Sequence, residues 1–129
     1  MSEPIKVSIL GGSYGVGMPD FAAREEMMFA YGDARTKRGT TILRVYAAAL
    51  GLCTRLGKES GASYQKSGFD VLNYGGEVYG WLRQKGVTPA DIVTAAIPVI
   101  VRVSEETFPR QDEVVEAMGN SEGGTDSGS

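Results

Sequence analysis

The sequence contains no histidine. Histidine serves as the general base beside catalytic serine or cysteine and is a common zinc ligand. Its absence excludes Ser-His-Asp and Cys-His catalysis, histidine-based acid–base chemistry and most zinc sites. The acidic residues are scattered and show no metal-ligand spacing. We therefore expect a protein that is not an enzyme and that has no catalytic residues, cofactor or metal.

Cysteine, basic charge and long apolar runs are also scarce. The single cysteine, Cys53, allows no internal disulfide, which agrees with a reducing compartment. A net charge of −3 removes the main sequence argument for nucleic-acid binding. There is no N-terminal signal-peptide pattern, and no apolar stretch approaches the roughly twenty residues of a membrane span. The 129 residues suit one globular domain, with neither nucleic acid nor membrane as a partner.

Residues 69–103 predict two helices joined by a tight turn. The apolar residues within 72–85 follow helical spacing, and Gly86 can adopt the left-handed conformation that ends a helix. Thr88 is expected to cap the second helix, with Pro89 at its first position. These local signals agree with one another, so the hairpin is the element around which we organise the chain.

The second helix of this pair is unusually hydrophobic. Residues 92–103 leave almost no polar face, which predicts a helix buried on all sides. Pro98 is expected to kink or end it, and the polar residues 104–107 indicate a break. Either the core of the protein or a partner must cover this helix.

The N-terminus predicts one strand. Residues 5–10 alternate between apolar and polar side chains, and the partner strand is either a short one elsewhere in the chain or another copy. The glycine-rich residues 11–17 lack the lysine of a phosphate loop and the spacing of a dinucleotide-binding loop. We interpret them as a flexible linker.

Two further helices are predicted before the hairpin. The first is opened by Pro19 and Asp20 and reaches residue 31. The second begins after Thr40 or Thr41, contains small residues at 47–51 that let another helix approach closely, and ends at Gly57. Arg44 and Arg55 lie eleven residues apart, which places them on nearly the same face of this helix.

The remaining segments complete a mostly α fold. Cys53 is expected to be buried, residues 58–68 to form a loop, and 110–118 a short last helix. The predicted fold is a small helical domain of four to five helices with one N-terminal β-strand and a disordered C-terminal tail. Its parts are the strand and glycine-rich linker at 1–18, the helical domain at 19–118 and the disordered tail at 119–129.

The succession of helical motifs resembles the small tail assembly chaperones of tailed phages and phage-like elements. The resemblance covers residues 19–120. It is carried by residues 44–53 (RVYAAALGLC), 69–79 (FDVLNYGGEVY), 81–87 (WLRQKGV) and 109–117 (PRQDEVVEA). The N-terminal strand and glycine-rich segment have no counterpart in this family pattern.

The resemblance implies a non-enzymatic function. Proteins of this family bind the tape-measure protein during tail assembly, shield its apolar helices and recruit tail-tube protein. They act in the host cell cytoplasm and are absent from the mature virion. We accordingly expect the tape-measure and tail-tube proteins as partners, with a homo-oligomer as a further possibility.

Two alternatives remain open. The chain can be a virion structural protein of the neck or head–tail connector, or a small nucleotide-binding domain that uses the glycine loop. For the preferred function we predict partner contacts at Arg44, Tyr74, Tyr79 and Trp81, because arginine and aromatic residues are enriched in protein interfaces.

Overall fold

The computed structural model describes residues 5–36, 39, 41–64 and 70–108. Its elements are β1 (Lys6–Ile9), β2 (Gly12–Gly15), α1 (Phe21–Arg35), α2 (Thr41–Cys53), α3 (Leu56–Ser60), α4 (Val71–Gln84) and α5 (Pro89–Thr107). The mostly helical fold is therefore confirmed. The helix predicted at 110–118 and the tail at 119–129 lie outside the described residues.

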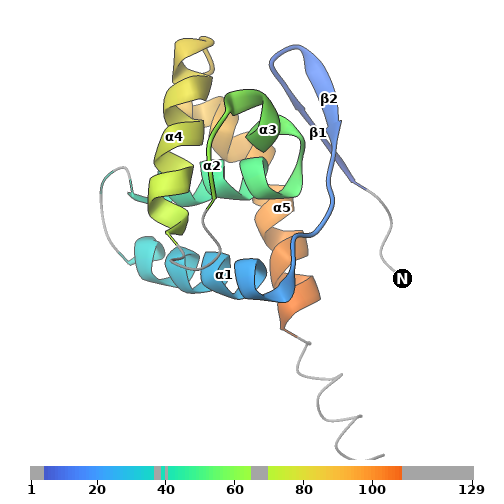
Figure 1. Ribbon diagram of the computed structural model, residues 1–129, viewed down its shortest axis with the longest axis vertical. Coiled ribbons are helices and arrows are strands. Elements are labelled where there is room, and N and C mark those ends of the chain that lie inside the picture. Colours follow the sequence, from blue (N-terminus) through green and yellow to red (C-terminus); the bar gives the residue numbers. More distant parts are fainter. Residues whose placement is uncertain (1–4, 37–38, 40, 65–69, 109–129) are drawn as a thin grey trace, which may run out of the picture.

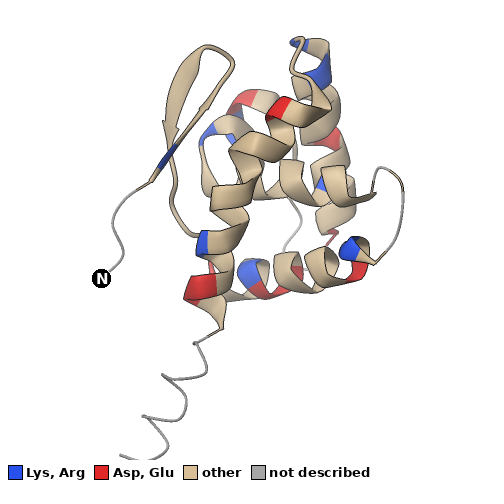
Figure 2. Cartoon of the chain, turned by 180° about the vertical axis from the view of Figure 1, so that it is seen from behind, with Lys and Arg blue, Asp and Glu red and all other residues tan. Residues whose placement is uncertain are grey.

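The helices pack around α2, and the β-hairpin stands beside them (Figure 1). One apolar core runs through both parts, since Val7, Ile9 and Tyr14 of the hairpin belong to the same buried cluster as the helices. Basic and acidic residues are interspersed along the described helices (Figure 2). The hairpin thus contributes to the core rather than only leading into it.

The predicted strand finds its partner within the chain. β1 pairs antiparallel with β2, so the interpretation of the glycine-rich segment as a flexible linker was wrong. Leu10 and Gly11 connect the strands with φ angles of 57° and 69°. Such a left-handed pair matches the twist of a two-residue hairpin turn. The turn is hard to predict from the sequence, because its first residue is Leu10, whereas asparagine or glycine is usual at a position with positive φ.

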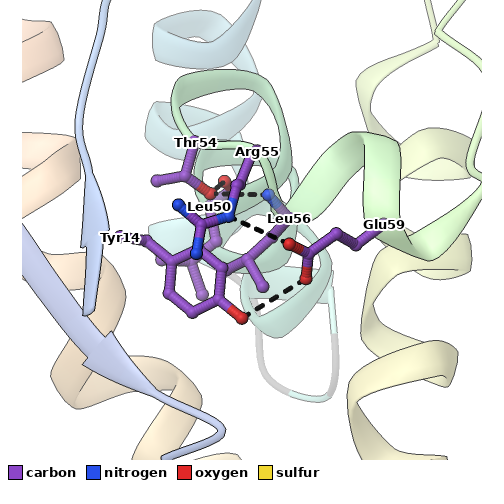
Figure 3. Close-up of polar contacts among 6 residues, drawn as sticks. All are labelled: Tyr14, Leu50, Thr54, Arg55, Leu56 and Glu59. Carbon is purple, nitrogen blue, oxygen red and sulfur yellow. Dashed lines mark hydrogen bonds and ion pairs between the residues drawn. The ribbon is translucent and has the colours of Figure 1, made fainter. Parts of the chain in front are cut away.

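Tyr14 fixes the hairpin to the helices. Its hydroxyl donates a hydrogen bond to Glu59 Oε1 at 3.3 Å, and the guanidinium carbon of Arg55 lies 4.5 Å from the ring centroid (Figure 3). Arg55 Nε contacts Glu59 Oε2 at 3.0 Å and completes the cluster. The backbone N–H of Gly17 also donates to the carbonyl oxygen of Cys53 at 2.7 Å. The hairpin is therefore held against the end of α2 and α3.

The second predicted helix is in fact two. α2 ends at Cys53, and α3 begins at Leu56, so Gly57 lies inside a helix and residues 58–60 are not loop. The Thr54 hydroxyl explains the break, because it donates to the Leu50 carbonyl at 2.5 Å and accepts from the Leu56 N–H at 3.1 Å. The prediction that Arg44 and Arg55 share a helix face was accordingly wrong.

Small residues bring α2 and α4 together, as predicted. A Cβ atom added to Gly75 would lie 1.9 Å from the carbonyl oxygen of Arg44, and one added to Gly51 would lie 2.7 Å from the hydroxyl of Tyr74. Cys53 is buried beside these residues, also as predicted. At Gly75 the backbone of α2 leaves no room for a side chain, and at Gly51 the space is occupied by the Tyr74 side chain.

The turn between α4 and α5 follows the predicted chemistry. Gly86 has a φ of 90°, and the Thr88 hydroxyl accepts a hydrogen bond from the Asp91 N–H at 3.1 Å. Pro89 occupies the first position of α5. α1 begins with a similar cap, in which the Asp20 carboxylate accepts from the Ala23 N–H at 3.0 Å. These signals act between residues that are close in sequence.

Two helices are longer than predicted. α1 continues past residue 31 to Arg35, and α5 continues through both Pro98 and residues 104–107. Pro98 removes one backbone hydrogen bond, the one that the Thr94 carbonyl would accept. Both residues lie on the exposed side of α5, where water can satisfy that carbonyl, so the helix persists.

Candidate functional site

One side of α5 exposes apolar side chains to solvent. Ile97, Val101 and Phe108 are 47%, 49% and 48% exposed. Ile97 and Val101 are four residues apart, which aligns them on one side of α5, and Phe108 is the residue that directly follows the helix. The prediction that residues 92–103 are buried all round was therefore wrong for one face of α5. The other face is buried in the core, where Ile92, Val99 and Val103 have no exposed surface.

The exposed Val101 and Phe108 line a groove between α1 and α5, whereas Ile97 is not among the lining residues. The groove has a volume of about 360 Å³. The residues that line it are Met28, Tyr31, Gly32 and Arg35 from α1, Ile100, Val101, Ser104 and Glu105 from α5, and Phe108, which directly follows α5. We call this feature the α1–α5 groove. Gly32 has no side chain, and a Cβ added there would meet nothing within 4 Å, so the groove is open at this point.

Phe29 is an exposed residue of α1 that lies next to the α1–α5 groove in the helix without lining it. It is 68% exposed, the highest value among the exposed large hydrophobic residues of the described chain. It follows Met28, a groove residue, and it precedes Gly32 by three positions, which makes the two neighbours on the helix surface. An aromatic ring held in water beside an apolar groove is typical of an interaction surface.

The two walls of the groove carry opposite charges. Arg35 on α1 extends over the ring of Tyr31, with 5.7 Å between the guanidinium carbon and the ring centroid. Glu105 on α5 lies 3.9 Å from Arg102 and keeps 58% of its side chain exposed. A partner that enters the groove therefore meets an apolar floor between a basic edge and an acidic edge.

Tyr74, one of the predicted contact residues, lies in the core. It is only 5% exposed, and its ring meets that of Tyr64 in a T-shaped arrangement with centroids 5.4 Å apart. Its hydroxyl packs against Gly51 and Gly57. Tyr74 thus holds α2, α3 and α4 together, and burial of its side chain does not favour a partner contact.

The other three predicted residues do not form one patch. Tyr79 and Trp81 are partly exposed, but residues two apart on a helix point about 200° away from each other. The Lys85 ammonium lies 5.7 Å from the Trp81 ring centroid. Arg44 is exposed and runs alongside Gly76, one turn before Tyr79. Arg44 and Tyr79 therefore lie near one another along α4, and Trp81 lies on a different side of that helix.

Phe29, Val101 and Phe108 were not predicted as contact residues. A signal for Phe29 was present, because Met27, two residues earlier and fully buried, points in nearly the opposite direction on the helix. Both cannot face the same core. No comparable signal marks Val101, since the apolar residues of α5 surround the helix and only packing decides which side is covered.

Cys53, the single cysteine of the chain, is buried. Burial raises the pKa of the Cys53 thiol to about 12, which opposes formation of a nucleophilic thiolate. Among the described residues, no group of acidic or cysteine side chains is arranged to hold a metal ion. The glycines at 12–15 form a strand rather than a phosphate-binding loop before a helix. The described helices include none that is long and apolar enough to cross a membrane.

Comparison of the chain with models of protein families, with curated proteins and with solved structures finds no match.

Proposed function

We propose that this chain is a non-enzymatic assembly chaperone that binds an amphipathic helix of a client protein in the α1–α5 groove. The sequence resemblance suggests the tape-measure protein of a phage tail as that client, with tail-tube protein as a second partner. The observation that carries the proposal is the exposure of Val101 and Phe108, which line this groove, together with that of Ile97 on α5 and Phe29 on α1.

A groove between two helices suits a helical client. A third helix can lay its apolar face along α1 and α5 and bury side chains that are otherwise in water. Binding of this kind uses anchors at helical spacing, and α5 exposes Ile97 and Val101 four residues apart. The charged rim, with Arg35 and Glu105 on opposite walls, would orient the client.

The test compares two substitutions at exposed positions. Val101→Asp places a charge inside the groove, whereas Phe21→Asp changes a side chain that is equally exposed on α1 but does not line the groove. Titration of fragments of the tape-measure protein should give an affinity at least roughly tenfold lower for Val101→Asp than for the unchanged chain. Phe21→Asp should bind as the unchanged chain does.

Two results would contradict the proposal. Equal loss of affinity in both variants would show that the groove is not the binding site. A chain that binds no tape-measure fragment, and that is found in purified particles at ring stoichiometry, would be a structural component instead. Circular dichroism of both variants provides the check that the helices remain folded.

The neck or connector function is the second candidate. The observation that favours it is the β-hairpin, because a sheet of two strands has an outer edge on both β1 and β2. Such edges can pair with a neighbouring copy in a ring. Lys6 lies in β1 with its side chain exposed, and proline in its place would block pairing along that edge without entering the core.

A further inference from the structure

We propose that, in the absence of a client, two copies of this chain pair through the α1–α5 groove, with Phe29 of each copy inserted into the groove of the other. The pairing is inferred from the geometry of the groove and its rim. Its competition with a client rests on the proposed function.

The first argument is the fit between Phe29 and the groove. A cavity of about 150 Å³ accepts a benzene molecule, so a groove of about 360 Å³ has room for a phenyl ring. Its lining includes Met28, Ile100 and Val101, which are apolar. Phe29 is the most exposed large hydrophobic side chain of the described residues, and burial of an aromatic ring is strongly favourable.

The second argument is the position of Phe29 beside the groove that would receive its counterpart. When a protruding side chain and its receptor lie next to each other on one face, rotation of a second copy by 180° lets both insert at once. Such a pair closes on itself. The same contact between different faces would instead add copies without limit.

The third argument is charge. The α1 wall carries Arg35 and the α5 wall carries Glu105. A two-fold axis can place the basic wall of one copy beside the acidic wall of the other, which gives two equivalent contacts of opposite charge. A face of this kind attracts its own copy even though each chain carries a net charge of −3.

The pairing has a consequence for function. It removes Phe29, Val101 and Phe108 from water while no client is present, which protects an exposed apolar surface from aggregation. A client helix must then displace the second copy. We expect the apparent affinity for a client to fall as the concentration of the chain rises, because pairing and client binding use the same groove.

Sedimentation velocity across a dilution series tests the pairing. The unchanged full chain should shift from monomer to dimer at or below about 100 µM. Phe29→Ser should raise the dissociation constant of the dimer by roughly thirty-fold or more, because a central aromatic anchor is lost. Phe21→Ser removes an aromatic ring of similar exposure on the same helix and should leave the dimer unchanged.

A charge reversal gives an independent test. Arg35→Glu and Glu105→Arg should each weaken the dimer, and the double variant should restore it, because opposite charges then face each other again across the two-fold axis. Weakening in the double variant equal to the sum of the single effects would contradict the proposed pairing.

The remaining outcomes are equally definite. A chain that stays monomeric throughout the series overturns the inference, including the case in which residues 109–129 of the same chain cover the groove. A dimer that survives Phe29→Ser also overturns it. If the dimer forms as expected and no tape-measure fragment competes with it, the inference stands and the proposed function fails.

Discussion

Gly75 on α4 lies directly against the carbonyl oxygen of Arg44 on α2. A Cβ atom at Gly75 would come within 1.9 Å of that oxygen, far inside van der Waals contact. Because the obstacle is backbone, no change of rotamer can relieve the clash. The two helices pack at this distance only because residue 75 has no side chain.

We expect Gly75→Ala to destabilise the protein by at least about 2 kcal/mol, because α2 and α4 must move apart to admit the methyl group. Urea unfolding followed by circular dichroism measures the change in the free energy of unfolding. Gly80→Ala is the matched control. It lies in the same helix with nothing within 4 Å of the added Cβ, and it should stabilise by about 0.5–1 kcal/mol through helix propensity.

Loss of the hydrogen bond from Tyr14 to Glu59 should lower the free energy of unfolding by less than Gly75→Ala does. Tyr14→Phe should reduce the free energy of unfolding by about 1 kcal/mol, since the ring and its contact with Arg55 remain while the hydroxyl is lost. Tyr14→Ala should cost about 3 kcal/mol, because it also empties a buried site. Equal stability of Tyr14→Phe and the unchanged chain would show that the bond is not formed in solution.

The turn of the β-hairpin predicts a contrast between two glycines. Gly11→Ala forces a Cβ into the left-handed region at a φ of 69° and should destabilise by about 1 kcal/mol. Gly15→Ala lies in β2, where an added Cβ meets nothing within 4 Å, and should change the stability little. Thermal unfolding of both variants decides the point. Similar loss in both would mean that the turn differs from the one described.

The buried thiol of Cys53 predicts sensitivity to alkali. Its pKa is about 12 in the folded chain and 9.0 in the reference state, so the unfolded chain loses this proton first. The contribution of the thiol to stability is therefore complete below pH 9 and declines as the pH rises towards 12. Urea unfolding at several pH values should show a shallower decline for Cys53→Ala. Parallel curves for both proteins would contradict this assignment.

The local signals in the sequence were the reliable ones. Gly86, Thr88 and Pro89 predicted the turn between α4 and α5, and the small residues of α2 predicted close approach of another helix. The predictions were wrong where contacts outside the local sequence changed the expected effect of a residue on a helix. Pro98 does not end α5, because it lies on the exposed side of the helix. Thr54 ends α2 within a stretch whose apolar periodicity predicted one continuous helix.

The α1–α5 groove could likewise not be predicted from local sequence signals. An aromatic residue such as Tyr74 satisfies the composition of an interface and is nevertheless buried. Phe29 was visible as the side of α1 opposite Met27, but its relation to α5 was not, because the two helices are separated by more than fifty residues of sequence. The groove exists only through the packing of these distant elements.

The sequence by itself determined where α1, α2, α4 and α5 begin, where α4 ends, the mostly α class and the absence of histidine chemistry. Those properties depend on side-chain types and on hydrogen bonds between residues a few positions apart. The tertiary structure alone decided that β1 pairs with β2, that Tyr74 faces the core, and that one stripe of α5 is left in water. These outcomes depend on which distant surfaces are buried together, and no spacing along the chain encodes that choice.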